Sequence, residues 1–256
     1  MDVEFVFLAL GLAALFAGFV DSIVGGGGLI QLPALFAAFP TTAPATLFGT
    51  NKLASIVGTA SAAVQYSRRV QIPWRVAGPG ALAALVGSWF GAKAVVLLDP
   101  AVLRPLILLM LVLVAAYTFV RKDLGAVSRE PAHGLRSAVL AVGIGGVIGF
   151  YDGFFGPGTG SFLIFLFIRL LGMDFLRASV SAKILNVATN VAAIAYFAGS
   201  VQLMWGLAAV MAVCNLTGSV IGSRMALRHG TAFVRKMFLA VVSVLIVRLA
   251  YDTFLR

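Results

Sequence analysis

Charged side chains are scarce in this sequence. They make up only 11% of its 256 residues, whereas hydrophobic residues make up 61%, and the mean hydropathy is +1.04. A soluble domain has roughly 25% charged residues, which cover much of its surface. This chain cannot cover itself with polar groups, so lipid must be its solvent. The composition therefore excludes an ordinary soluble domain and predicts an all-α integral membrane protein.

Cysteine and histidine, which supply most metal sites and many catalytic groups, are almost absent. The sequence holds one cysteine, Cys214, and two histidines, His133 and His229. These numbers exclude a disulfide within the chain and a Cys/His metal cluster. Neither a His-Glu-x-x-His motif nor a Gly-x-Ser-x-Gly elbow occurs. We therefore expect neither enzyme activity nor a metal or other cofactor.

Acidic residues are also few, and the net charge of +10 could suggest a nucleic-acid partner. The basic residues argue against this interpretation because they are scattered in short loops between apolar runs, as at Arg68-Arg69, Arg121-Lys122 and Arg235-Lys236. Basic loops between apolar spans mark the cytoplasmic side of a membrane protein. We therefore expect lipid, and no nucleic acid, as the partner of this surface.

Long apolar runs dominate what remains. Eight to ten hydrophobic segments are expected, and a spanning helix needs about 20 residues. Two segments are shorter and each follows a glycine-rich break, Gly25–Gly28 or Gly153–Gly160. These short segments are either full crossings or parts of hairpins that return to the side they entered. The segments are 4–20, 28–40, 45–66, 75–98, 102–120, 137–151, 157–171, 177–198, 204–226 and 233–252.

The two halves of the chain align without a gap at an offset of 131 residues. Apolar matches are weak evidence in so biased a composition, but polar and aromatic residues match in the same frame. The pairs include Asp21 with Asp152, Lys52 with Lys183, Gln71 with Gln202, Trp74 with Trp205 and Gly87-Ser88 with Gly218-Ser219. We interpret this as an internal repeat, with a first unit at 1–120, a basic linker at 121–136 and a second unit at 137–256.

Loop charges predict that the two units have opposite orientations. The loop at 67–75 of the first unit is basic, whereas the equivalent loop of the second unit, at 198–203, is uncharged. The loop at 99–101 holds only Asp99 as a charged residue, whereas the equivalent region at 226–236 is basic. Because basic loops stay in the cytoplasm, each unit crosses the membrane an odd number of times. The sequence thus predicts an inverted-topology repeat with a cytoplasmic linker and both termini outside.

The glycine-rich breaks are the best candidates for a binding site. Interrupted segments at matching positions of two halves are typical of transporter sites. A helix that starts inside the membrane presents free backbone N–H groups and the positive end of its dipole, which favour an anion. The alternative is that the glycines only allow close helix packing, which we expect for Gly87–Gly91 and Gly218–Gly222. The candidate substrate-binding residues of the breaks are Gly25, Gly26, Gly27, Gly28, Gly156, Gly158, Thr159, Gly160 and Ser161.

Ionisable residues inside apolar segments add charge to this site. Lys52 and Lys183 lie about two turns into their segments. A charged side chain at such a position costs free energy, which makes it a candidate for function. Lys183 is the stronger candidate substrate ligand, because Asn186 and Asn190 follow it on the same helical face. Asn51 is the neighbour of Lys52 and completes the candidate set.

Two carboxylates, Asp21 and Asp152, stand just before the glycine breaks. Burial beside the breaks makes them candidates for the group that takes up and releases a transported proton. Within each half, the Asp and the Lys could pair. A purely structural ion pair, or a lysine that extends to the membrane surface, is the alternative.

Several of these motifs resemble the sulfite exporter TauE/SafE family of permeases. The first half carries the resemblance at Gly18–Gly28, Pro33 and Gly49–Leu53, and the second half at Gly149–Gly160 and Ala182–Asn190. The similarity extends over nearly the whole chain. It implies a plasma-membrane permease for sulfur-containing anions such as sulfite or sulfonates, coupled to the proton gradient.

Residues and resemblance together predict a secondary transporter of small sulfur oxyanions, with its site between the two repeats. The alternative function is an uncoupled anion channel. The expected partners are the anion, protons and the bilayer; a homodimer is compatible with the sequence.

Overall fold

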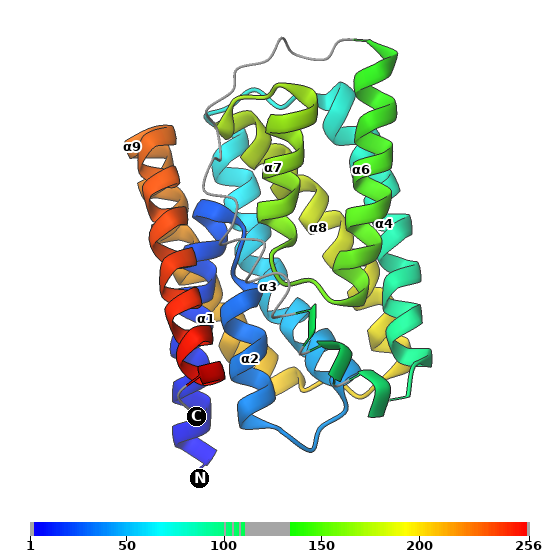
Figure 1. Cartoon of the computed structure of the whole chain (residues 1–256), viewed down its shortest axis with the longest axis vertical. Helices are drawn as coiled ribbons and strands as arrows, with labels where there is room; N and C mark the ends of the chain where they lie inside the picture. The colour runs from blue at the N-terminus through cyan, green and yellow to red at the C-terminus, as the bar shows by residue number, and fades with distance from the viewer. Residues whose placement is uncertain (1–2, 100, 104, 108, 111–133, 255–256) are drawn as a thin grey trace.

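The structure is a computed structural model. It describes the backbone of residues 3–99, 101–103, 105–107, 109–110 and 134–254, and side chains between residues 4 and 230 of these ranges. The secondary structure described there is helical, as predicted (Figure 1). The helices are α1 (Val3–Val24), α2 (Gly28–Ala38), α3 (Pro44–Ser67), α4 (Trp74–Leu97), α6 (Leu135–Phe154), α7 (Thr159–Leu171), α8 (Phe175–Ser200) and α9 (Trp205–Phe254).

Local sequence explains where several helices begin and end. Pro44 opens α3, where its fixed backbone angle suits a first turn and no N–H is needed. Asp174 caps α8 by accepting hydrogen bonds from the N–H groups of Leu176 and Arg177, at 3.1 and 3.0 Å. Gly172 ends α7 in the left-handed region, with φ of 68°. These signals fix the short connections around the central helices.

The two short helices belong to hairpins. In Figure 1, α2 runs back beside α1 toward the end of the molecule that holds both termini, and α7 runs back beside α6 toward the opposite end. Both hairpins turn in the middle of the molecule, at the glycine-rich breaks. The sequence left open whether the short segments are full crossings or parts of hairpins, and the structure has the hairpins.

Five helices among the described residues are long and apolar enough to cross a membrane: α1, α4, α6, α8 and the part of α9 from Trp205 to Gly230. The 24-residue α3 is less apolar because polar side chains run along one of its faces. The predicted segments 204–226 and 233–252 are joined in α9, where the backbone departs from helical geometry at Gly230. Most of the predicted segment 102–120 lies outside the described residues.

The helices of the two halves are packed across one another. α4 lies against α6 and α8, α9 lies against α1 and α3, and α3 contacts α8 at the centre. Glycines allow the closest contacts: a Cβ added at Gly87 or Gly91 would collide with the α6 backbone, and one at Gly218 or Gly222 with atoms of α1. These glycines therefore have the helix-packing role that we predicted.

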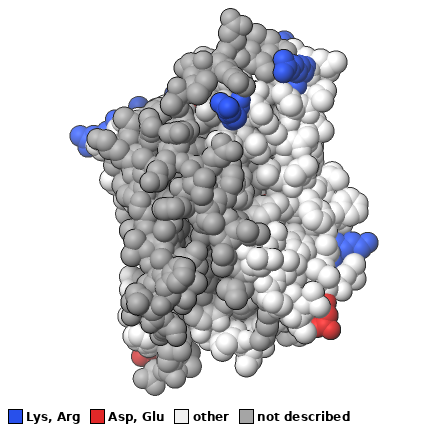
Figure 2. All heavy atoms as spheres, in the orientation of Figure 1, with Lys and Arg blue, Asp and Glu red and all other residues white. Residues whose placement is uncertain are grey.

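Charge is distributed unevenly between the two ends of the molecule. On the face shown in Figure 2, most visible Lys and Arg side chains gather at the upper end, whereas Asp and Glu lie at the lower end. The lower end also holds both termini (Figure 1). The described loops at 67–75 and 198–203, which the sequence predicts to be cytoplasmic and external, are at opposite ends (Figure 1).

Candidate functional site

The turns of the two hairpins touch each other at their glycines. Gly25, with φ of 81°, packs so closely on Gly160 that a Cβ on it would lie 2.5 Å from the Gly160 carbonyl carbon. Hydrogen bonds join the two turns. Ser161 donates its N–H to the Gly25 carbonyl at 3.3 Å and its hydroxyl to the Val24 carbonyl at 2.8 Å. The breaks of the two halves therefore form one structural unit.

This unit brings together the N-terminal ends of α2 and α7. A Cβ at Gly28, the first residue of α2, would be 3.2 Å from Cα of Pro157, just before α7. Within the described part of the chain, neither the Gly28 nor the Gly158 N–H donates a hydrogen bond. Two helix dipoles thus point their positive ends at the same region, and two backbone donors are available there.

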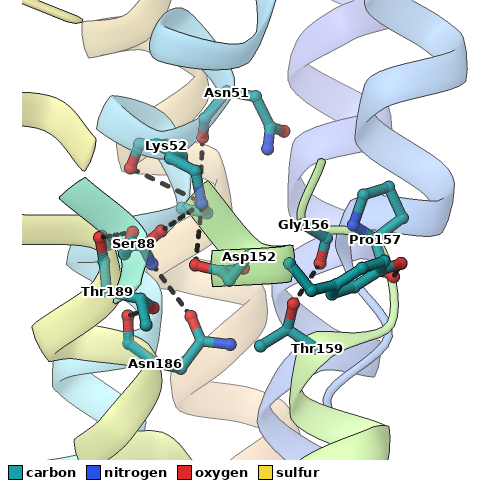
Figure 3. Close-up of polar contacts among 12 residues, drawn as sticks. Asn51, Lys52, Ser88, Asp152, Gly156, Pro157, Thr159, Asn186 and Thr189 are labelled. Carbon is teal, nitrogen blue, oxygen red and sulfur yellow. Dashed lines mark hydrogen bonds and ion pairs between the residues drawn. The ribbon is translucent and has the colours of Figure 1, made fainter. Parts of the chain in front are cut away.

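A chain of polar side chains from α3, α6 and α8 faces the breaks (Figure 3). The Lys52 ammonium lies 2.8 Å from a carboxylate oxygen of Asp152 and also donates to the side-chain oxygen of Asn190 at 3.3 Å. Asn190 in turn donates to Asn186 at 3.0 Å. Lys52 and Asp152 have only 5% and 4% of their side chains exposed, so this ion pair is buried.

The ion pair differs from the pairing within each half that the sequence allowed. Lys52 of the first half pairs with Asp152 of the second half. The reason is the crossed packing: α3 contacts α8 at the centre, and α6 ends beside them. The pairing partner is thus set by contacts between the halves.

The other Asp and Lys make different contacts. A carboxylate oxygen of Asp21 accepts the Gly27 N–H at 3.3 Å, and the other accepts the Thr59 hydroxyl at 3.2 Å. Lys183 reaches the backbone carbonyl of Asp21 at 3.4 Å. Its ammonium also lies 4.8 Å from the ring centre of Tyr66, a cation–π distance. Lys183 is therefore held by groups of the protein itself.

The breaks and the polar side chains that face them line a small cavity of about 30 Å³, which has room for one or two water molecules. Eleven of the predicted site residues line it: Asp21, Gly25, Gly27, Gly28, Asn51, Lys52, Asp152, Gly156, Gly158, Asn186 and Asn190. Five predicted residues are not part of its lining: Gly26, Thr159, Gly160, Ser161 and Lys183. Of these, Gly160 and Ser161 join the two turns, and the Thr159 hydroxyl donates to the Gly156 carbonyl at 2.7 Å (Figure 3).

Four further lining residues were missed: Gln31, Ser55, Thr59 and Asn215. Ser55 and Thr59 follow Lys52 by three and seven positions, so helical spacing could have identified them. Asn215 donates to Gln31 at 3.2 Å and to the Ala14 carbonyl at 3.2 Å. An amide in an apolar segment is itself a signal, and α2 and α9 each carry one.

The cavity combines unpartnered donors with two carboxylates. The buried amide nitrogen of Gln31 has no hydrogen-bond partner, and neither has the buried side-chain oxygen of Asn51. The Gln31 donor adds to the Gly28 and Gly158 N–H groups and the Lys52 ammonium. No group of three metal-binding side chains occurs among the described residues. Such an arrangement can bind a small anion, and the carboxylates can exchange a proton beside it.

Comparison with known proteins shows which family the chain belongs to. Residues 10–249 match the family model described as "Sulfite exporter TauE/SafE". The chain is 36% identical over 241 residues to the "Probable membrane transporter protein YfcA" of Escherichia coli (strain K12), covering 94% of this chain and 88% of that protein. It is 35% identical over 253 residues to the "Probable membrane transporter protein ORF9" of Sinorhizobium sp, covering 98% and 95%. No solved structure gave a significant match. This integral membrane protein thus belongs to the sulfite exporter TauE/SafE family.

Proposed function

We propose that the protein is a proton-coupled secondary transporter that moves a small sulfur-containing oxyanion, such as sulfite or an organosulfonate, across the plasma membrane. One observation carries the proposal. Two helix starts with unpartnered N–H groups meet a buried lysine–carboxylate pair at one small cavity. The relatives named as membrane transporters support transport over catalysis.

The donors of the cavity suit an oxyanion. Each helix start contributes roughly half a positive charge, and the Lys52 ammonium contributes a full one. The side chains of Asn186, Asn190 and Gln31 supply neutral hydrogen bonds. An oxyanion has several acceptor oxygens around one centre, so it can use donors that come from several directions. The family description names sulfite, and for this chain we propose sulfur oxyanions on that basis.

The ion pair suggests how a proton is coupled to the anion. While Asp152 is ionised, it occupies the Lys52 ammonium at 2.8 Å. Protonation of Asp152 removes its charge and leaves the ammonium free for the substrate. A proton and an anion then bind together, so that no uncompensated charge is left in the low-dielectric cavity. The second carboxylate, Asp21, accepts hydrogen bonds from neutral donors, the Gly27 N–H and the Thr59 hydroxyl. Loss of these bonds would free no cation for the anion, so Asp152 is our principal candidate for the proton carrier.

An inverted repeat would give this site two alternating openings. Contacts across the halves support the repeat. The hydroxyl of Ser88 donates to the Thr189 carbonyl at 2.7 Å, and that of Ser219 donates to the Gly58 carbonyl at 2.6 Å. Donors and acceptors are related by the same 131-residue offset. The cavity has room for one or two water molecules in this conformation, so it would have to widen to bind an oxyanion.

Transport assays with purified protein in liposomes test the proposal. We expect uptake of labelled sulfite or of a small sulfonate to exceed equilibrium when an inward proton gradient is imposed, and to collapse when a protonophore is added. An uncoupled channel would only equilibrate the anion and would show no accumulation beyond that set by the membrane potential. Absence of any transported sulfur anion would reject the substrate class.

A further inference from the structure

A second hollow, of about 1140 Å³, lies outside the transport site, between α3 and α9. Successive helix residues are rotated by about 100°, which places Val57 and Val64 about 140° and about 120° around α3 from Lys52. Val57 and Val64 have 40% and 49% of their surface exposed. The hollow therefore lies on the outer face of the helix pair.

The lining of this hollow is positively charged at one end and apolar along its length. The basic end consists of Arg68, Arg69, Arg224 and Arg228. No Asp or Glu is part of the lining, and neither ion pair among the described residues uses these arginines. The apolar part is built by Val57, Val64, Leu176, Val220 and Leu227. A ligand that fits both parts must have an anionic head and an apolar body.

Two aromatic side chains occupy positions related to this hollow by the 131-residue offset. Trp89 of α4 and Tyr196 of α8 pack edge to face, with ring centres 5.1 Å apart. The residues at the corresponding positions of α9 and α3 are Val220 and Gln65, and both line the open hollow. The α3–α9 side thus has smaller side chains, which line the hollow, at the two positions where the α4–α8 side has a pair of aromatic rings.

We propose that this hollow binds an anionic phospholipid, with its phosphate on the arginines and an acyl chain along the α3–α9 face. Arginine pairs with phosphate through two parallel hydrogen bonds, and basic pockets between membrane helices bind acidic head groups. A soluble phosphate would leave the apolar part empty. A second copy of the chain docked through the same face would bring four more arginines to the contact.

Lipid binding by detergent-purified protein tests this assignment. We expect phosphatidylglycerol to raise the unfolding temperature and to remain bound in native mass spectra, and phosphatidylcholine with the same chains and inorganic phosphate to have little effect. The variant Arg224→Gln/Arg228→Gln should bind phosphatidylglycerol at least about tenfold more weakly, since each basic residue contributes about 1 kcal/mol near an anionic lipid. The control Arg75→Gln/Arg169→Gln removes the same charge outside the hollow and should change affinity less than about twofold.

A second variant leaves every arginine in place. Gln65→Tyr/Val220→Trp copies the aromatic pair into the hollow and should also weaken phosphatidylglycerol binding. Equal binding of phosphatidylcholine, equal stabilisation by phosphate, or equal loss in the control variant would overturn the proposal. So would a covalent dimer formed in membranes by Val64→Cys in a Cys214→Ser background, because a second copy would then cover this face.

Discussion

At the scale of single residues, the two repeat-related lysines have different surroundings. Lys52 lines the cavity and faces Asp152, whereas Lys183 contacts a backbone carbonyl and the face of Tyr66. Equivalent positions in the sequence therefore have unequal roles in this conformation. The structure shifts our main candidate for the substrate ligand from Lys183 to Lys52.

Replacement of Lys52 should lower both the stability of the protein and its affinity for the anion. Lys52→Met leaves a buried Asp152 without its partner, and breaking such a pair costs about 3–5 kcal/mol. We expect a lower unfolding temperature and at least about tenfold weaker anion binding, which is about 1.4 kcal/mol. Lys183→Met should weaken binding much less, because Lys183 is not part of the cavity lining. Thermal unfolding and anion titration of the purified variants measure both effects.

The double variant Lys52→Met/Asp152→Asn distinguishes a ligand from a structural partner. It removes both charges and should recover most of the stability that Lys52→Met loses. Anion affinity should stay low if Lys52 binds the substrate. Recovery of affinity in this double variant would show that Lys52 serves only to neutralise Asp152.

Asp152 is the residue on which the proposed coupling depends. Asp152→Asn cannot release a proton, so accumulation driven by a proton gradient should be lost while exchange of anion across the membrane continues. Because Lys52 is then free at every pH, exchange should also lose its dependence on acidic conditions. Counterflow and gradient-driven uptake in liposomes measure the two activities. Normal accumulation by Asp152→Asn, by Asp21→Asn and by the double variant would refute a carboxylate proton carrier.

At the scale of helices, the sequence predicted the segments well and their partners poorly. The glycine breaks located the starts of α2 and α7 because only irregular backbone explains such runs in an apolar chain. Pairing of Lys52 with Asp152 could not be predicted, since it depends on how α3 crosses α8. Gln31 and Asn215 were missed for the same reason: their contact joins α2 to α9, which are 184 residues apart at this point.

The contact between the two hairpin turns should be intolerant of a single methyl group. Gly25→Ala places a side chain at φ of 81° and drives its Cβ into Gly160, and the left-handed conformation alone costs about 1–2 kcal/mol. Gly160→Ala meets the Gly25 backbone in turn. We expect both variants to unfold at lower temperature and to lose transport.

Gly143→Ala is the matched control for these substitutions. It lies in α6, where an added Cβ meets nothing within 4 Å, and alanine is favoured over glycine in a helix by about 1 kcal/mol. Its stability should be unchanged or higher. If Gly25→Ala and Gly160→Ala behave like Gly143→Ala, the turns are not in the close contact described here.

At the scale of the whole molecule, the two hairpins are arranged around the central cavity. The hairpins enter from opposite ends and meet at the cavity, and the charge of the surface differs between those ends (Figures 1 and 2). Basic residues favour the cytoplasm, so we propose that the arginine-rich end is cytoplasmic and that both termini face outward. With this orientation, the two hairpins would offer the site to the two sides of the membrane in turn.

Ser67 and Ser200 provide the test of this orientation, because they end α3 and α8 and are both exposed. In a Cys214→Ser background, each serine is replaced by cysteine and treated with a membrane-impermeant maleimide in intact cells and in inverted vesicles. We expect Ser67→Cys to react only in inverted vesicles and Ser200→Cys only in intact cells. The reason is that α3 and α8 run in opposite directions between the two ends of the molecule (Figure 1). Labelling of both positions from the same side would reject the inverted arrangement, and reversal of both sides would keep the repeat but place the arginine-rich end outside.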